Sequence, residues 1–174
     1  YRMYHDGYDG THYRILSAVS VDGLAWTKEE GVRIDVGGIY DSLYANNPVV
    51  VKVPDGRYIM FYLGESEEWV GQILSAVSTD GLTWSKEDGI RIERGEYALV
   101  APGDIIKLSD DQYRMYITAD RYPVWIDRIR ILSAIGKFVP PMLMEGPYYT
   151  WWGAEYWIVQ CEERRPVRPI SNYY

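Results

Sequence analysis

A segment of twenty residues occurs twice in this chain. Residues 15–34 read ILSAVSVDGLAWTKEEGVRI and residues 73–92 read ILSAVSTDGLTWSKEDGIRI, so that 15 of the 20 positions are identical. The first four letters return at Ile131, which follows Ile73 at the same interval as Ile73 follows Ile15. A second phrase keeps the same order, with YRMYH from Tyr1, YIMFY from Tyr58 and YRMYI from Tyr113. Such regular repetition predicts an architecture of similar structural units.

One full repeat predicts four short antiparallel strands. A β-branched run at 48–53 is followed by a tight-turn signal at 54–57 and an apolar strand pattern at 58–63. A third strand is expected at 73–78 and a fourth from Thr83 and Trp84 through Ile92. No segment shows the 3.6-residue apolar period of a helix, which disfavours a solenoid of strands and helices. Four strands per repeat are typical of one blade of a β-propeller.

The predicted fold is therefore all-β. We expect a single β-propeller region with four-stranded antiparallel blades, about three to three and a half of them in this chain. Because closed propellers have about four to eight blades, closure is expected to need additional sequence, a second copy of the chain or the tail. Tyr1 starts inside a repeat, so we expect a fragment or a chain without its leader. Within residues 1–174 the predicted parts are a partial blade at 1–45, a full blade at 46–101, a blade with an altered fourth strand at 102–144, and the start of a further blade with a divergent tail at 145–174.

Composition narrows the classes of partner. A net charge of −7 with scattered basic residues argues against nucleic-acid binding. No apolar run approaches the roughly 20 residues needed to span a bilayer, so no membrane partner is expected. Cys161 is the only cysteine, which excludes an intrachain disulfide. Aromatic residues make up 15% of the chain and fit both strand packing and the stacking of sugars.

In a four-stranded meander the connections alternate between the two ends of the sheet. We call one end the rim face, because it carries the starts of the first strands, which lie innermost, and the loops between second and third strands. Carboxylates and aromatic rings gathered there favour a sugar site, although exposed loops are also polar simply because they meet water. The predicted rim-face residues are Asn46, Asn47, Asp104 and Glu145, with Glu65, Glu67, Glu68 and Trp69 in one loop, Asp120, Arg121, Tyr122, Trp125, Asp127 and Arg128 in the next, and His5, Asp6, Asp9 and His12 in the loop of the partial blade.

The opposite end, the turn face, receives the two S-x-D-G-L-x-W turns at Ser20–Trp26 and Ser78–Trp84. Their Asp-Gly pairs are the residue types that a tight hairpin turn requires. Each turn resembles the Asp-box of sialidases, with one residue fewer between Asp and Gly, and the Asp-box is structural in that family. We therefore interpret these turns as scaffold, with Trp26 and Trp84 packed between neighbouring blades.

A further motif, Glu145-Gly146-Pro147, is followed by a segment rich in tyrosine and tryptophan. It resembles the E-G-P motif of glycoside hydrolase family 43. That family and the related families of invertases and levansucrases are five-bladed propellers whose site lies at the channel mouth. The resemblance implies three acids: an Asp as base or nucleophile, a second Asp that tunes the acid and orients the sugar, and the Glu of E-G-P as general acid.

Carried over to this chain, the resemblance places Glu145 on the general acid and makes Asp104 a candidate for the second Asp. Alignment of the Tyr58 and Tyr113 phrases puts Asp104 two positions late, and an irregular start of its strand would realign it. Where the family has Asp before Pro, this chain has Asn47, and an amide cannot act as base or nucleophile. The missing carboxylate is expected in a blade before Tyr1. The candidate substrate-binding residues are Asn47, Trp69, Arg121, Tyr122, Trp125, Tyr148 and Trp152.

The resemblance implies a glycoside hydrolase-like propeller that acts on or binds plant-type or microbial polysaccharide with furanoside or pentoside units. An extracellular or periplasmic location is favoured. No cofactor and no metal site is predicted, since His5 and His12 lack a ligand constellation, although a calcium ion in the channel would fit the resemblance. Two alternatives stay open. Asn47 favours a non-catalytic carbohydrate-binding propeller, and exposed strand edges favour an assembly module or homo-oligomer completed by another chain.

Overall fold

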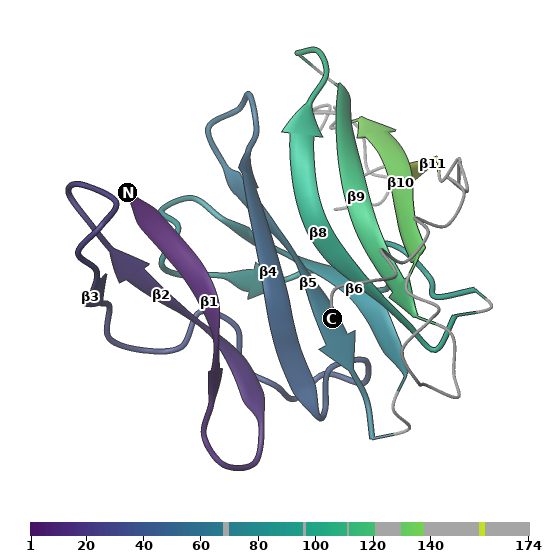
Figure 1. The fold of residues 1–174 in the computed structure, drawn as a ribbon, viewed down its shortest axis with the longest axis horizontal. Coiled ribbons are helices and arrows are strands. Elements are labelled where there is room, and N and C mark those ends of the chain that lie inside the picture. Colours follow the sequence, from purple (N-terminus) through teal and green to yellow (C-terminus); the bar gives the residue numbers. More distant parts are fainter. Residues whose placement is uncertain (68–69, 96, 111, 121–129, 138–156, 159–174) are drawn as a thin grey trace, which may run out of the picture.

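The structure is a computed structural model that describes residues 1–67, 70–95, 97–110, 112–120, 130–137 and 157–158. All regular secondary structure in these ranges is β-strand, which confirms the all-β prediction. Three consecutive groups of strands, here called the first, second and third units, lie side by side (Figure 1). Within the described part of the chain, no helix is long and apolar enough to cross a membrane.

The first unit is a three-stranded antiparallel sheet. It contains β1 (Arg2–Tyr8), β2 (Tyr13–Val19) and β3 (Thr27–Lys28) in the order β1-β2-β3. By its repeat phrase β1 corresponds to the second strand of the next unit, as the sequence predicts for a partial blade. His5 and Asp6 lie within β1 and not in the following loop, where the sequence placed them.

The second unit contains β4 (Tyr44–Lys52), β5 (Tyr58–Glu65), β6 (Gly71–Ser78) and β7 (Ser85–Lys86), each antiparallel to the one before. The predicted turn closes between β4 and β5, where Gly56 has a φ of 91°, in the region that favours glycine. The first three predicted strands of this repeat are therefore confirmed. β4 starts at Tyr44, ahead of its β-branched run.

The third unit contains β8 (Leu99–Lys107), β9 (Gln112–Asp120), β10 (Arg130–Lys137) and β11 (Trp157–Ile158). A single parallel pair, Gly71 with Leu99, joins it to the second unit. The strands of the two units consequently form one hydrogen-bonded path, and the described sheets do not close into a ring.

The predicted fourth strand at 83–92 is interrupted, which corrects the sequence prediction. Only β7 is a strand, and Ile92 then returns to form an isolated bridge with Ile73. Gly89 lies between these two pieces with a φ of 81°, so the chain turns there instead of extending. The first unit repeats this arrangement with β3 and a second isolated bridge.

Two buried clusters show how the units pack. Alternate residues of β5 point to opposite faces of its sheet, so Met60 and Tyr62 belong to one cluster while Ile59 and Phe61 belong to the other. The units thus pack face to face. Burial of each large apolar side chain contributes about 1.5–3 kcal/mol to the free energy of folding. The cluster between the first and second units is Ile15, Ile34, Ala45, Met60, Tyr62, Leu74 and Ala76. The cluster between the second and third units is Val53, Ile59, Phe61, Ile73, Ile92, Val100, Met115, Ile117, Ala119, Leu132 and Ala134.

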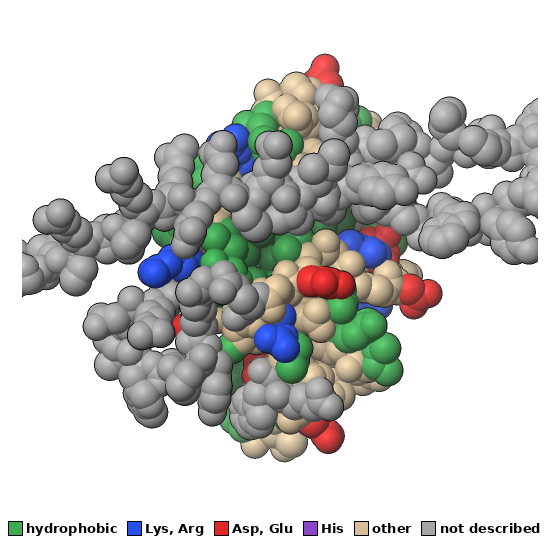
Figure 2. Space-filling model, turned by 90° about the vertical axis from the view of Figure 1, so that its right-hand side faces the viewer, with side chains coloured by type: hydrophobic (Ala, Val, Ile, Leu, Met, Phe, Trp, Pro, Cys, Tyr) green, Lys and Arg blue, Asp and Glu red, His purple; other side chains and the backbone are tan. Residues whose placement is uncertain are grey.

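The described residues on the side of the molecule at the right of Figure 1 carry charges of both signs. Figure 2 shows hydrophobic side chains near the centre of this face, with basic and acidic side chains scattered around them. No single sign dominates the described part of this view.

A buried carboxylate, Asp41, anchors the segment between β3 and β4 to the second unit. It accepts hydrogen bonds from the Tyr62 hydroxyl at 3.0 Å, the Lys86 ammonium at 2.5 Å and the Gly38 amide at 2.6 Å. Burial raises the pKa of Tyr62, and the charge of Asp41 raises it further. A buried carboxylate needs such partners, because an unpaired one would be strongly destabilising.

The S-x-D-G turns are closed by their own side chains. In the second unit Asp80 Oδ1 accepts the amides of Leu82 and Thr83, both at 2.8 Å, while Ser78 Oγ accepts the amide of Gly81 at 2.8 Å. Donation from these amides holds the pKa of Asp80 at about 2. The turn of the first unit has the same bonds, centred on Asp22. These contacts give the turns a structural role.

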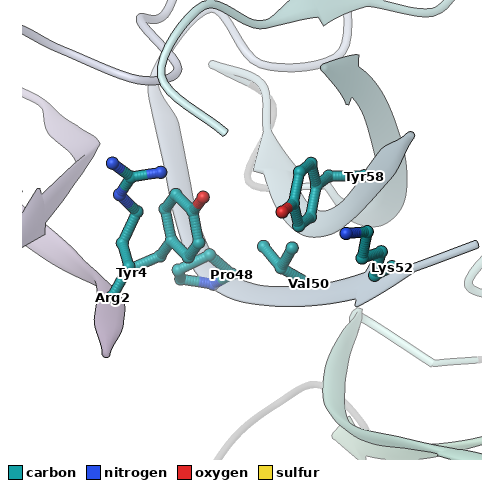
Figure 3. A pocket seen from close by; sticks show the side chains of 6 residues that line it. All are labelled: Arg2, Tyr4, Pro48, Val50, Lys52 and Tyr58. Atoms are coloured by element: carbon teal, nitrogen blue, oxygen red, sulfur yellow. The ribbon is translucent and has the colours of Figure 1, made fainter. Parts of the chain in front are cut away.

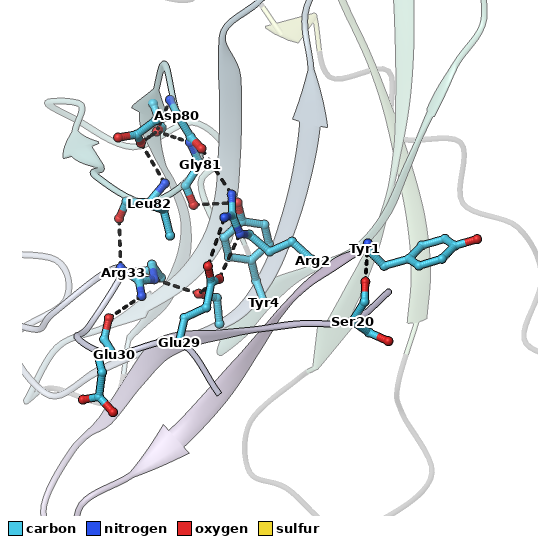
Figure 4. Close-up of polar contacts among 12 residues, drawn as sticks. Tyr1, Arg2, Tyr4, Ser20, Glu29, Glu30, Arg33, Asp80, Gly81 and Leu82 are labelled. Atoms are coloured by element: carbon cyan, nitrogen blue, oxygen red, sulfur yellow. Dashed lines mark hydrogen bonds and ion pairs between the residues drawn. The ribbon is translucent and has the colours of Figure 1, made fainter. Parts of the chain in front are cut away.

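The turn of the second unit docks onto the first unit (Figure 4). Arg2 donates to the carbonyl oxygen of Asp80 at 3.2 Å, and the Tyr4 hydroxyl donates to that of Gly81 at 2.8 Å. The Trp84 ring meets the Tyr4 ring edge-on, with centroids 5.6 Å apart. Trp84 therefore packs between units as predicted, whereas Trp26 remains 38% exposed.

The inner strands β4 and β8 carry matching β-bulges. The ladder shifts between Asn46 and Val49 in β4 and between Pro102 and Asp104 in β8. Asn47 has a φ of 52°, in the left-handed region that few non-glycine residues adopt. β4 contacts both β1 and β8, so the inner strands of the second and third units lie side by side.

β1 is an edge strand of its sheet, so one side of its backbone bonds to β2 and the other side points outward. Tyr1 and Ser20 exchange two backbone hydrogen bonds, at 2.7 and 3.0 Å, so the odd-numbered residues of β1 bond to β2. The backbones of Arg2 and Tyr4 therefore point to the other side, where no described strand pairs with them. In the second unit the residue equivalent to Tyr4 is Phe61, which pairs with β4.

Candidate functional site

The structure describes two of the residues that the sequence singles out for a site, Asn47 and Asp104. The remaining candidates lie outside the described residues; they are Glu145, Trp69, Arg121, Tyr122, Trp125, Tyr148 and Trp152.

Asn47 lies in the bulge of β4 and is exposed. Its backbone N–H donates a 2.8 Å hydrogen bond to Asp6 Oδ1, which joins the second unit to the first. The bulge makes this bond available, because Asn47 falls outside the β4–β5 ladder and Pro48 has no N–H to donate. The family resemblance expects an acid at the position of Asn47, where this chain has an amide. The carboxylate of Asp6 lies beside that position.

Asp6 is a functional candidate that the sequence placed on the rim face but did not assign to the catalytic acids or to substrate binding. The residue is exposed at the surface, while its carboxyl group is buried enough against β4 that desolvation raises its pKa, an effect that the bond from Asn47 partly offsets. The repeat contains a signal for it, since the equivalent positions in the other two units are Leu63 and Thr118. A carboxylate at a position that is otherwise apolar or neutral marks a departure from the scaffold pattern.

Asp104 lies in β8 and is exposed. It stands opposite Tyr116 on the neighbouring strand, just as Val49 stands opposite Phe61 in the second unit. The irregular start expected at Pro102 and Gly103 is present, but β4 has the same bulge. Because the two bulges match, Asp104 occupies the position equivalent to Val49 and not the position equivalent to Asn47.

Three tyrosines lie near Asp6 and Asn47. Tyr8 ends β1, Tyr13 begins β2 and Tyr44 begins β4. The ring centroids of Tyr8 and Tyr13 are 4.8 Å apart, and those of Tyr13 and Tyr44 are 5.3 Å apart. The three rings form a continuous aromatic cluster across the two units.

A further rim-face carboxyl group is Glu65, at the end of β5 and paired with Tyr44 in the ladder. Burial raises the pKa of Glu65 above its ordinary value. Carboxyl groups with raised pKa values near one rim are the pattern expected of acid–base chemistry, although structural sites also produce such shifts.

The two histidines hold backbone carbonyls. His5 Nδ1 lies 2.9 Å from the carbonyl oxygen of Asp6, and His12 Nδ1 lies 3.0 Å from that of Leu43. Since a carbonyl oxygen can only accept, Nδ1 is the protonated nitrogen in both contacts. Among the residues that the structure describes, no group of three His, Cys, Asp or Glu is arranged to hold a metal ion.

A groove of about 480 Å³ runs between β1 and β4 toward the β4–β5 turn (Figure 3). At the end of the groove near the β4–β5 turn, Lys52 Nζ lies 5.4 Å from the centroid of the Tyr58 ring. Arg2 borders the other side and is already bound to Glu29 at 2.9 Å. The residues that line the groove are Arg2, Tyr4, Pro48, Val50, Lys52 and Tyr58.

Solved structures with a similar fold are carbohydrate-active proteins. Fructan 1-exohydrolase IIa from Cichorium intybus has a TM-score of 0.61 and 15% identity over 78% of this chain and 27% of its own length. A protein described as a glycoside hydrolase has a TM-score of 0.58 and 16% identity, covering 85% of this chain and 43% of that chain. The fold is glycosidase-like. β-1,2-Mannobiose phosphorylase from Listeria innocua shares this glycosidase-like fold, with a TM-score of 0.53 and 15% identity over 71% of this chain and 33% of that chain.

Comparison of sequences finds relatives without an assigned activity. Two uncharacterized proteins of Mycobacterium tuberculosis, Rv1502 of strain H37Rv and MT1551 of strain CDC 1551, are each 34% identical over 102 residues, 53% of this chain. The matched segment spans 33% of the length of these relatives. No family model matches the chain.

Proposed function

We propose that this chain is part of a glycoside hydrolase of the family 43 type, built as a β-propeller of four-stranded blades. Its substrate would be a polysaccharide with furanoside or pentoside units, bound where the inner strands meet at the rim face. The glycosidase-like fold supports this class. The observation that carries the proposal is the hydrogen bond from Asn47 to Asp6, because it brings a carboxyl group to the place where the sequence has an amide.

Glycoside cleavage needs two carboxyl groups that flank the bond. One protonates the leaving oxygen, and the other activates water or attacks the anomeric carbon. We assign the first role to Glu145 and the second to Asp6, with Asp104 as a candidate for orienting the sugar. Asp6 suits its role because Asn47 holds one carboxylate oxygen, Oδ1, so the orientation of the other oxygen is fixed as well.

Hydrolysis of aryl arabinofuranosides, xylosides and fructosides tests this assignment. Glu145→Gln and Asp6→Asn should each lower kcat by about 100-fold or more, while Asp104→Asn should change kcat less and KM more. Asp88→Asn, an exposed residue that follows β7, is the matched control. Wild-type protein that cleaves none of these glycosides would overturn the proposal, as would a folded Asp6→Asn variant with full activity.

A non-catalytic carbohydrate-binding propeller is the second candidate, and Asn47 is the observation that favours it. An amide keeps hydrogen bonding to sugar hydroxyls but cannot ionise. Calorimetric titration with oligosaccharides distinguishes the two, since this candidate predicts binding without turnover.

An assembly role rests on the edge of β1 that no described strand pairs with. Unpaired strand edges readily bond to another chain. Measurement of mass in solution over a range of concentrations tests this role, and a strict monomer would remove its support.

A further inference from the structure

Two rings of the aromatic cluster, Tyr8 and Tyr13, are exposed, while Tyr44 is partly buried. Tyr8 is 56% exposed and Tyr13 is 37% exposed. Cross-strand tyrosine pairs do stabilise sheets, but that role alone does not require their rings to stay open to solvent. Large exposed aromatic surface at one site is more typical of a binding surface.

The hairpin that carries two of these rings is held rigidly. Asp9 Oδ1 accepts the amides of Thr11 at 2.9 Å and His12 at 2.8 Å, and the Tyr8 hydroxyl donates to the carbonyl oxygen of Gly10 at 2.8 Å. Arg14 pairs with Asp9 as well. A surface whose side chains are already ordered loses less conformational entropy when a ligand binds.

A separate contact fixes the hairpin against the next unit. The ring of His12 donates from Nδ1 to the carbonyl oxygen of Leu43 at 3.0 Å. Tyr13 follows His12 and Tyr44 follows Leu43, and the rings of the two tyrosines meet edge-on with an interplanar angle of 77°. The relative position of the three rings is thus set before any ligand arrives.

The cluster also adjoins the proposed acid site. Tyr8 follows Asp6 by two positions on the same strand, so their side chains point to the same side of the sheet. Tyr44 and Asn47 both lie in the first half of β4. The tip of the β1–β2 hairpin and the start of β4 lie at the same end of the molecule (Figure 1).

We propose that Tyr8, Tyr13 and Tyr44 form a stacking platform for a sugar ring of an oligosaccharide whose neighbouring unit lies at Asp6. This inference rests on the proposed function. Tyrosine offers an apolar face to the C–H groups of a sugar and a hydroxyl to its polar edge. Phosphorylated ligands fit this place poorly, because Asp6, Asp9 and Asp35 outnumber Arg14, which pairs with Asp9 and Asp35.

Titration with arabino-, xylo- and fructo-oligosaccharides of increasing length, each compared with its monosaccharide, tests the platform. Tyr8→Ala and Tyr13→Ala should each weaken binding of the longer oligosaccharide about five- to tenfold and leave the monosaccharide affinity unchanged. Tyr13→Phe keeps the ring and should bind within about twofold of wild type. Tyr1→Ala is the control, since Tyr1 is 78% exposed outside the cluster.

The outcomes separate this inference from the proposed function. Unchanged oligosaccharide affinity in both alanine variants would overturn the platform, even if the wild type hydrolyses glycosides. Weakened binding in those variants without hydrolysis by the wild type would support the platform and overturn the hydrolase. A wild-type protein that binds none of the oligosaccharides would overturn both.

Discussion

Ser75 Oγ donates a hydrogen bond of 2.6 Å to Glu87 Oε2. The same hydroxyl oxygen accepts a 2.6 Å bond from Arg91 Nε. Ser17 makes the equivalent bond to Glu29, at 2.7 Å, in the first unit. The serine of the ILSA phrase therefore ties the interrupted outer strand back to its sheet in both repeats.

Ser75→Ala should lower the free energy of unfolding by about 1–3 kcal/mol. Ser75 is fully buried, so its loss removes the hydroxyl group that Glu87 and Arg91 share and leaves only their direct contact at 3.5 Å. Chemical denaturation measures the change, with the exposed Ser85→Ala as control. Equal unfolding midpoints for the two variants would contradict a structural role of this serine.

Glu145 follows Ser133 at the same spacing as Glu87 follows Ser75, so it is also the repeat equivalent of that structural glutamate. As the proposed general acid, Glu145 should tolerate substitution by Gln without a change in thermal midpoint while hydrolysis is lost. Glu87→Gln is the matched control and should lower the midpoint. A similar fall in Glu145→Gln and Ser133→Ala would instead assign Glu145 to the structural role of Glu87.

Tyr4→Phe should destabilise the protein by about 1 kcal/mol. The substitution keeps the ring that contacts Trp84 but removes the 2.8 Å bond to the carbonyl oxygen of Gly81. Thermal unfolding of Tyr4→Phe, with Tyr1→Phe as the control variant, measures the effect. Indistinguishable curves would show that docking of the turn depends on ring packing alone.

The Asp80 turn predicts a loss of stability in acid. The pKa of Asp80 is lowered from 3.8 to about 2, so the unfolded chain binds a proton at a higher pH than the folded one. The resulting stability is complete above pH 3.8 and is lost as pH falls toward 2. Asp80→Asn should therefore differ from wild type at neutral pH and converge with it in strong acid, whereas the exposed Asp88→Asn should not. A difference that is constant with pH would contradict this account.

Hydrogen exchange tests the outer edge of β1. The Tyr4 amide points away from β2, so it should exchange faster than the amide of Phe61, which faces β4 in the second unit. Within β1 it should also exchange faster than the amide of Met3, which faces β2. Equal protection of Tyr4 and Met3 would show that another strand covers this edge in solution.

Local sequence patterns were sufficient to predict most strands of the repeat. β5 begins at its predicted start and β6 only slightly before its own, because each is a run of mostly apolar residues bounded by turn or loop signals. The fourth strand was predicted wrongly as one element. Its sequence has strand-like ends, but Gly89 turns the chain between them, and the two pieces pair with β6 at separate places.

The candidate site was less accessible to such reasoning. Asn47 was identified from its place before Pro48, yet its contact with Asp6 joins positions that are distant in sequence and belong to different units. A contact of this kind depends on how two sheets pack, and periodicity within one strand does not encode it. The tyrosine cluster was missed for the same reason, since its three rings come from three strands.

The repeated phrases alone established the all-β class, the order of the strands and the scaffold turns, because each depends on residues that are neighbours along the chain. Only the tertiary structure brought Asp6 to Asn47 and gathered the tyrosines at one rim. Those contacts arise from burial of Met60 and Tyr62 against the first unit, which sets the positions of β1 and β4 relative to each other. Hydrophobic burial is not directional along the sequence, so its partners are known only once the sheets have packed.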